Sequence, residues 1–62
     1  MKTNYFLCDQ NGRYVSQAGF EPMLVKGQEA AYFWNSVEAA QREARAYSVA
    51  LGTEVRVVAH AA

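Results

Sequence analysis

Cys8 and His60 are the only thiol and the only imidazole in this 62-residue chain. A cysteine becomes a strong nucleophile when a histidine lies within hydrogen-bond reach of it, which here would require the first and last strands to be neighbours in one sheet. Alternatively, Cys8 is a small buried hydrophobic residue of the apolar run 5–8, and His60 begins a frayed tail, residues 60–62. We favour the second interpretation and assign no catalytic residue.

Metal and phosphate chemistry would need residues that the chain lacks. A zinc site takes three or four ligands, mostly Cys and His, and a phosphate-binding loop needs closely spaced glycines, whereas the four glycines here are dispersed. Glu38 and Glu43 lie five positions apart, so on a helix they would point in different directions. A pocket on the order of several hundred Å³ would also consume most of so small a core. The sequence therefore predicts no enzyme, no metal and no cofactor.

The charge balance narrows the class of partner. Six Lys or Arg residues match six Asp or Glu residues, so the formal net charge is zero. Nucleic-acid binders need clustered basic residues, and these are absent. A single cysteine favours a reducing compartment, hence the cytoplasm, and no apolar run approaches the roughly twenty residues of a membrane span.

The first half of the chain has the pattern of a β-hairpin. The apolar run 5–8 and the alternating segment 13–17 flank Asn11-Gly12, which predicts a hairpin over about 4–17 with a type I′ or related turn. Residues 18–34 follow as a loop, with a pattern break at 18–22 and a short strand near 23–26 that Pro22 would confine to a sheet edge.

The second half has the pattern of a helix followed by a strand. Apolar residues at three- and four-residue spacing predict a helix over about 36–51. Asn35 with Glu38 fits a capping box, Ser36 is a competing N-cap, and Gly52 suits the left-handed C-terminal position. Alternating valines predict a strand over about 53–59. The chain is thus expected to be a single α+β domain over 1–62, a three- to four-stranded antiparallel sheet with one helix packed on one face, in the order β-β-(β)-α-β.

The aromatic residues exceed what a thin core can hold. Eight of the 62 residues are aromatic, while eleven are alanine. Tyr32, Phe33 and Trp34 are consecutive, and three consecutive side chains cannot all face one core. Phe33 or Trp34 could act as a hydrophobic staple at the start of the helix, with Tyr32 shielding it. Alternatively, some of these rings are exposed anchors of an interface, because Tyr and Trp dominate binding hot spots. The residues expected to bind a partner are Tyr5, Tyr14, Tyr32, Trp34, Asp9 and Glu29.

A resemblance covers roughly residues 33–58. It lies in Phe33-Trp34-Asn35-Ser36-Val37-Glu38-Ala39-Ala40, the alanine-rich helix that follows, Gly52, and the strand through Val55 and Val57. This pattern resembles that of very small phage and mobile-element proteins, the compact β-β-α-β proteins among which several anti-CRISPR inhibitors are found. The resemblance transfers no functional residue, but it implies a phage-encoded, non-enzymatic inhibitor that blocks a host complex by occupying its surface.

Two classes of function follow. The first is a protein-protein interaction module whose partner is a host protein or nucleoprotein complex, with a homodimer through the sheet as a further expectation. The second is a small nucleic-acid-binding domain, because a small sheet with one helix also resembles the DNA-binding arms of phage-type integrases. In that case Lys2, Arg13 and Arg56 would have to contact phosphates, and the zero net charge makes this class the weaker one.

Overall fold

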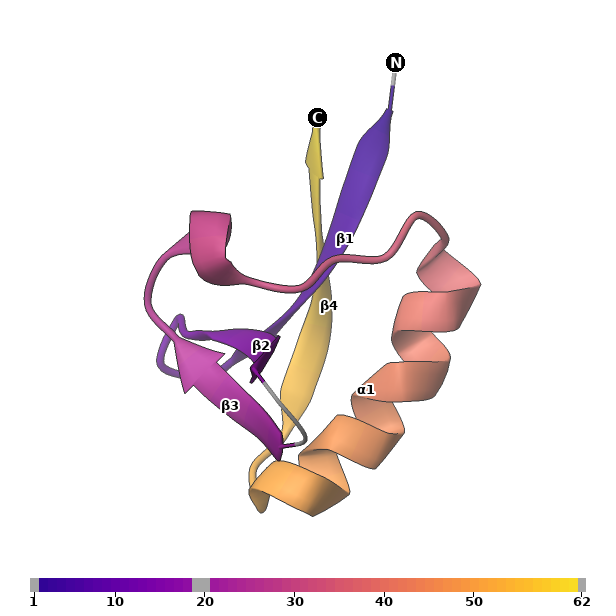
Figure 1. Cartoon of the computed structure of the whole chain (residues 1–62). Helices are drawn as coiled ribbons and strands as arrows, with labels where there is room; N and C mark the ends of the chain where they lie inside the picture. Colours follow the sequence, from indigo (N-terminus) through magenta and orange to yellow (C-terminus); the bar gives the residue numbers. More distant parts are fainter. Residues whose placement is uncertain (1, 19–20, 62) are drawn as a thin grey trace.

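The computed structural model describes residues 2–18 and 21–61, which form one antiparallel sheet with a helix on one face (Figure 1). The elements in chain order are β1 (Thr3–Asp9), β2 (Tyr14–Ala18), β3 (Glu21–Val25), the 3-10 turn η1 (Gln28–Ala30), α1 (Val37–Leu51) and β4 (Val55–Ala61). The strand order is β3-β2-β1-β4. The predicted α+β class and element order are confirmed, and β3 lies at an edge as expected. Part of the expected break at 18–22, Gly19-Phe20, lies outside the described residues.

The hairpin between β1 and β2 has a four-residue connection, residues 10–13. The Gly12 N–H donates to the Asp9 carbonyl at 3.2 Å, and the Asp9 N–H donates to the Arg13 carbonyl at 2.8 Å. Gly12 has φ +81°, whereas no described residue other than glycine has a positive φ. A type I′ turn needs positive φ at both central residues, so the turn is a related type, in which Gly12 alone is left-handed.

Helix α1 is capped by a side chain at its N-terminus and by a backbone N–H at its C-terminus. Ser36 is the N-cap, and its Oγ accepts a hydrogen bond from the Ala39 N–H at 3.3 Å. The capping box expected from Asn35 is therefore not formed, because the helix begins one residue later. The Ser36 hydroxyl instead donates to Glu38 Oε1 at 3.2 Å. Gly52 takes the left-handed conformation at φ +69° as predicted, which allows its N–H to reach the last turn of the helix.

Strand β4 lies two residues further along the chain than the sequence pattern indicated: it spans Val55–Ala61 and not 53–59. It pairs with β1 along its whole length, from Asp9 opposite Val55 to Thr3 opposite Ala61. The expected frayed tail is therefore wrong for His60 and Ala61, because β1 supplies backbone partners that far; Ala62 lies outside the described residues. The His60 ring also packs against Phe6 at 5.5 Å between centroids.

The core lies between the sheet and α1. Leu7, Val15, Ala40 and Val55 are buried and form one cluster. The helix contributes a fully buried alanine to this cluster, so its backbone can approach the sheet closely and few large side chains are needed. Within the described residues, the opposite face of the sheet carries no α-helix (Figure 1), and we call it the open face.

Candidate protein-interaction surface

The segment 32–34 lies in the sheet between β1 and β2. Beyond the pair Cys8 and Tyr14, β2 leaves β1, and the segment takes its place: Trp34 and Tyr5 exchange backbone hydrogen bonds of 2.8 and 2.9 Å, and the Tyr32 N–H donates to the Val15 carbonyl at 3.0 Å. Extended backbone sends successive side chains to opposite faces. The three consecutive rings are therefore divided between two faces.

Tyr32 and Trp34 lie on the helix side. The Trp34 ring packs edge-on between Tyr32 and Tyr47, at centroid distances of 4.8 and 5.9 Å. Trp34 and Tyr5 are half-buried and pack against the core cluster. Of these sequence-predicted partner residues, Tyr5 and Trp34 thus contribute to the folded core, while Tyr32 remains 48% exposed.

The open face carries a second aromatic cluster, centred on Phe6. Phe6 is only 4% exposed, because three rings surround it: Tyr14 at 5.7 Å, Phe33 at 6.1 Å and His60 at 5.5 Å. We call Phe6, Tyr14, Phe33 and His60 the aromatic patch. Phe33 is itself 47% exposed. It therefore covers the central Phe6 ring while about half of its own surface faces solvent.

Uncharged side chains make up most of the surroundings of the aromatic patch. The register places Met23 opposite Ser16, Val25 opposite Tyr14 and Val58 opposite Phe6, so these side chains share the open face. Met23 is 44% exposed. The charged residues that alternation assigns to this face, Glu21 and Arg56, lie at the outer ends of its strands. By contrast, the outer surface of α1 is charged through Glu38, Arg42, Glu43 and Arg45, all of which are exposed.

The acidic residues predicted to bind a partner are not brought together. The Asp9 side chain is 1% exposed and serves the hairpin turn: its carboxylate accepts hydrogen bonds from the Arg13 N–H at 2.8 Å and the Asn11 N–H at 3.0 Å, and pairs with the Arg13 guanidinium at 3.1 Å. The backbone hydrogen bond from Arg13, followed by that from Asn11 and the Arg13 side chain, holds the pKa of Asp9 below its usual value. Glu29 is exposed on η1.

Cys8 and His60 do not form a pair. Strands β1 and β4 are neighbours, but Cys8 lies opposite Arg56 and His60 opposite Asn4, a separation of about 13 Å along the strands at roughly 3.3 Å per residue. Burial, and secondarily the nearby Asp9 carboxylate, raises the pKa of the Cys8 thiol, which disfavours the thiolate. His60 Nε2 is buried without a hydrogen-bond partner within the described segments.

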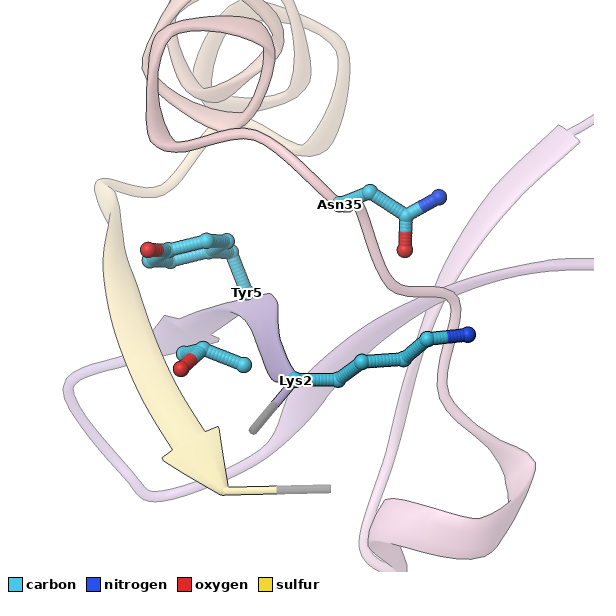
Figure 2. A pocket seen from close by; sticks show the side chains of 4 residues that line it. Lys2, Tyr5 and Asn35 are labelled. Carbon is cyan, nitrogen blue, oxygen red and sulfur yellow. The ribbon is translucent and has the colours of Figure 1, made fainter.

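A hollow of about 440 Å³ lies beside the start of β1, lined by Lys2, Thr3, Tyr5 and Asn35 (Figure 2). In this view the Lys2 ammonium and the Asn35 amide point to one side, while the Tyr5 hydroxyl points to the other. A catalytic or binding pocket needs polar groups that converge on one ligand. These groups diverge, and we assign no chemistry to the hollow. Over residues 2–18 and 21–61, no three Cys, His, Asp or Glu side chains are placed to hold a metal ion.

Sequence reasoning missed Phe33 and Met23 as exposed residues of the open face. The signal for Phe33 was present: once Trp34 is assigned to the helix side, an extended backbone must send Phe33 to the other face. Met23 could have been found from its alternation with the inward Leu24 in the predicted edge strand.

Comparison of the chain with models of protein families, with curated proteins and with solved structures finds no match. No helix in the described part of the chain is both long enough and apolar enough to cross a membrane.

Proposed function

We propose that this chain is a non-enzymatic protein-interaction module that binds its partner through the aromatic patch and the adjoining Met23. The observation that carries this proposal is the exposure of Phe33. A large ring that is 47% exposed, among mostly uncharged side chains on the sheet face that α1 leaves uncovered, resembles the aromatic anchors on which binding energy concentrates.

The apolar character of this surface supports a protein partner over a nucleic acid. Phosphate contacts need clustered, free basic groups, whereas the Arg13 guanidinium is paired with Asp9. Among the residues predicted to bind, Tyr14 belongs to this surface, and Tyr32 offers a second exposed ring on the helix side.

We further propose that the partner is a complex of a host cell and that the chain is a phage-encoded inhibitor acting in the host cytoplasm. This finer proposal is supported by the resemblance of residues 33–58 to the compact β-β-α-β inhibitors. It would follow that the chain acts by occupying a surface of the complex, without a chemical step.

Site-specific photocrosslinking tests the binding surface. A photoreactive phenylalanine analogue replaces Phe33 in one preparation and Val49 in another. Val49 is the matched control because it is 80% exposed and lies on the outward side of α1. Each preparation is irradiated in an extract of the cells in which the chain is made, and the products are treated with nuclease or protease.

The proposal predicts a discrete product from position 33 that survives nuclease and disappears with protease, and little product from position 49. A product that nuclease removes would instead establish the nucleic-acid function. Equal labelling from both positions would contradict the assignment of the open face.

A further inference from the structure

Strand β4 ends the sheet with an unpaired edge. Tyr5 exchanges backbone hydrogen bonds with Trp34, on the side away from β4, so Tyr5 and its opposite residue Ala59 do not bond to each other. In an antiparallel pair, bonded and non-bonded residue pairs alternate. The backbone groups of Val55, Val57, Ala59 and Ala61 therefore point outward.

Within residues 2–18 and 21–61, three of these four outward residues have no backbone hydrogen-bond partner on this side. The Val55 N–H donates to Ser48 Oγ at 3.1 Å, which is consistent with its outward direction. Across the described chain, no hydrogen bond engages the N–H or C=O of Val57, Ala59 or Ala61 on this side. This edge thus presents three donors and three acceptors in a regular row.

The other edge of the sheet is protected, and β4 is not. By the same alternation, the outward residues of β3 are Pro22 and Leu24, which lie opposite Gln17 and Val15. Pro22 has no N–H to offer, and natural sheets use such edge prolines and edge charges to prevent pairing with other chains. Between residues 57 and 61, β4 contains neither a proline nor a Lys, Arg, Asp or Glu residue.

We propose that β4 pairs with β4 of a second copy of this chain, antiparallel, about a two-fold axis at Ala59. Ala59 then lies opposite Ala59 of the second copy, and Val57 opposite Ala61. With three outward residues on each of two copies, each donating once, this register makes six backbone hydrogen bonds. It uses the free row of donors and acceptors completely and leaves the Val55–Ser48 bond intact.

The side chains and the charge are compatible with this pairing. On the helix side, Ala59 faces Ala59 of the second copy and Val57 faces Ala61, so the facing side chains are small. On the open face, Val58 lies opposite His60 of the second copy. No charged side chain lies within the paired segment, and the chain has no net charge to oppose association. The dimer would join two aromatic patches on one continuous sheet, but it forms whether or not these patches bind another protein.

Sedimentation velocity of the full chain tests the proposal. The concentration runs from about 10 µM to about 1 mM, because an interface this small forms only a weak complex. Ala59→Pro removes the central donor without touching the β1 ladder, since the Ala59 N–H points away from β1. Ala59→Ser is the matched control, because it changes the side chain and keeps the N–H.

The proposal predicts that wild type and Ala59→Ser approach the mass of two chains at the highest concentration, while Ala59→Pro stays at the mass of one. A wild-type chain that remains monomeric throughout, or a folded Ala59→Pro variant that still dimerises, would overturn it. If Ala59→Pro fails to fold, amide hydrogen exchange of the wild type decides: exchange at Val57, Ala59 and Ala61 must slow as concentration rises, and unchanged rates would overturn the proposal.

Discussion

Phe6 and Phe33 touch each other on the open face, and truncating each of them should have very different effects on stability. Complete burial of a Phe side chain stabilises a protein by about 1.5–3 kcal/mol. Phe33 is 47% exposed, so Phe33→Ala should lose about half of that, plus about 0.5 kcal/mol for its contact with Phe6. The expected loss in the free energy of unfolding is about 1–2 kcal/mol.

Phe6→Ala should be far more destabilising. Phe6 is 4% exposed and contacts three aromatic rings, and truncation of a core Phe costs about 3–5 kcal/mol. A chain of this length has a total stability of about 3–9 kcal/mol at about 0.05–0.15 kcal/mol per residue. The variant should therefore lose at least about a third of the total stability, and it would be unfolded if that stability lies in the lower part of the range.

Urea unfolding followed by the fluorescence of Trp34 measures both losses. With a urea dependence of about 1 kcal/mol per molar, Phe33→Ala should lower the midpoint by about 1–2 M. Tyr32→Ala is the matched control, because Tyr32 is equally exposed, at 48%, on the helix side. If Phe33→Ala were as destabilising as Phe6→Ala, Phe33 would act mainly as a core residue and not as an exposed anchor, and the binding role given to it would be refuted.

Three further predictions concern the helix N-cap, the hairpin turn and the Cys8 thiol. Ser36→Ala removes the helix N-cap and should cost about 1 kcal/mol in urea unfolding, and a change below about 0.3 kcal/mol would contradict the cap assignment. Asp9 has a lowered pKa in the folded state, so its contribution to stability is complete above the ordinary carboxyl pKa of about 3.9 and is lost as the pH falls through the lower folded value. Asp9→Asn should therefore lower the urea midpoint at pH 7 and flatten its decline in acid; an unchanged acid profile would count against the turn network. The raised pKa of Cys8 predicts slower alkylation by iodoacetamide at pH 8 than for free cysteine, and an equal or faster rate would contradict its burial.

The sequence predicted the elements whose signals are local. The hairpin follows from Asn11-Gly12 between apolar segments, and the helix from the spacing of its apolar stripe and from Gly52. These signals act within a few residues, so no knowledge of the rest of the chain is needed. The choice of Ser36 over Asn35 as N-cap was less accessible, because both residue types cap well and tertiary packing decides where the helix begins.

The arrangement of the aromatic residues could not be predicted from signals between residues close in the sequence. The segment 32–34 enters the sheet because β2 leaves β1 after one residue pair, which is a long-range event. This pairing alone determines that Trp34 packs toward Tyr47 while Phe33 covers Phe6. The position of β4 has the same origin, since residues 60 and 61 pair with β1.

Phe33 is the proposed binding anchor, and the affinity of the crosslinked partner for two variants tests this role directly. The partner is purified, and its Kd is measured for Phe33→Ala and for Tyr32→Ala. The two residues are neighbours with nearly equal exposure but lie on opposite faces of the sheet. Removal of a hot-spot aromatic costs at least about 2 kcal/mol, or roughly 30-fold in Kd. The account predicts such a loss for Phe33→Ala, with little salt dependence, and less than about a 5-fold loss for Tyr32→Ala. A loss confined to Tyr32→Ala, or equal losses for both, would contradict it.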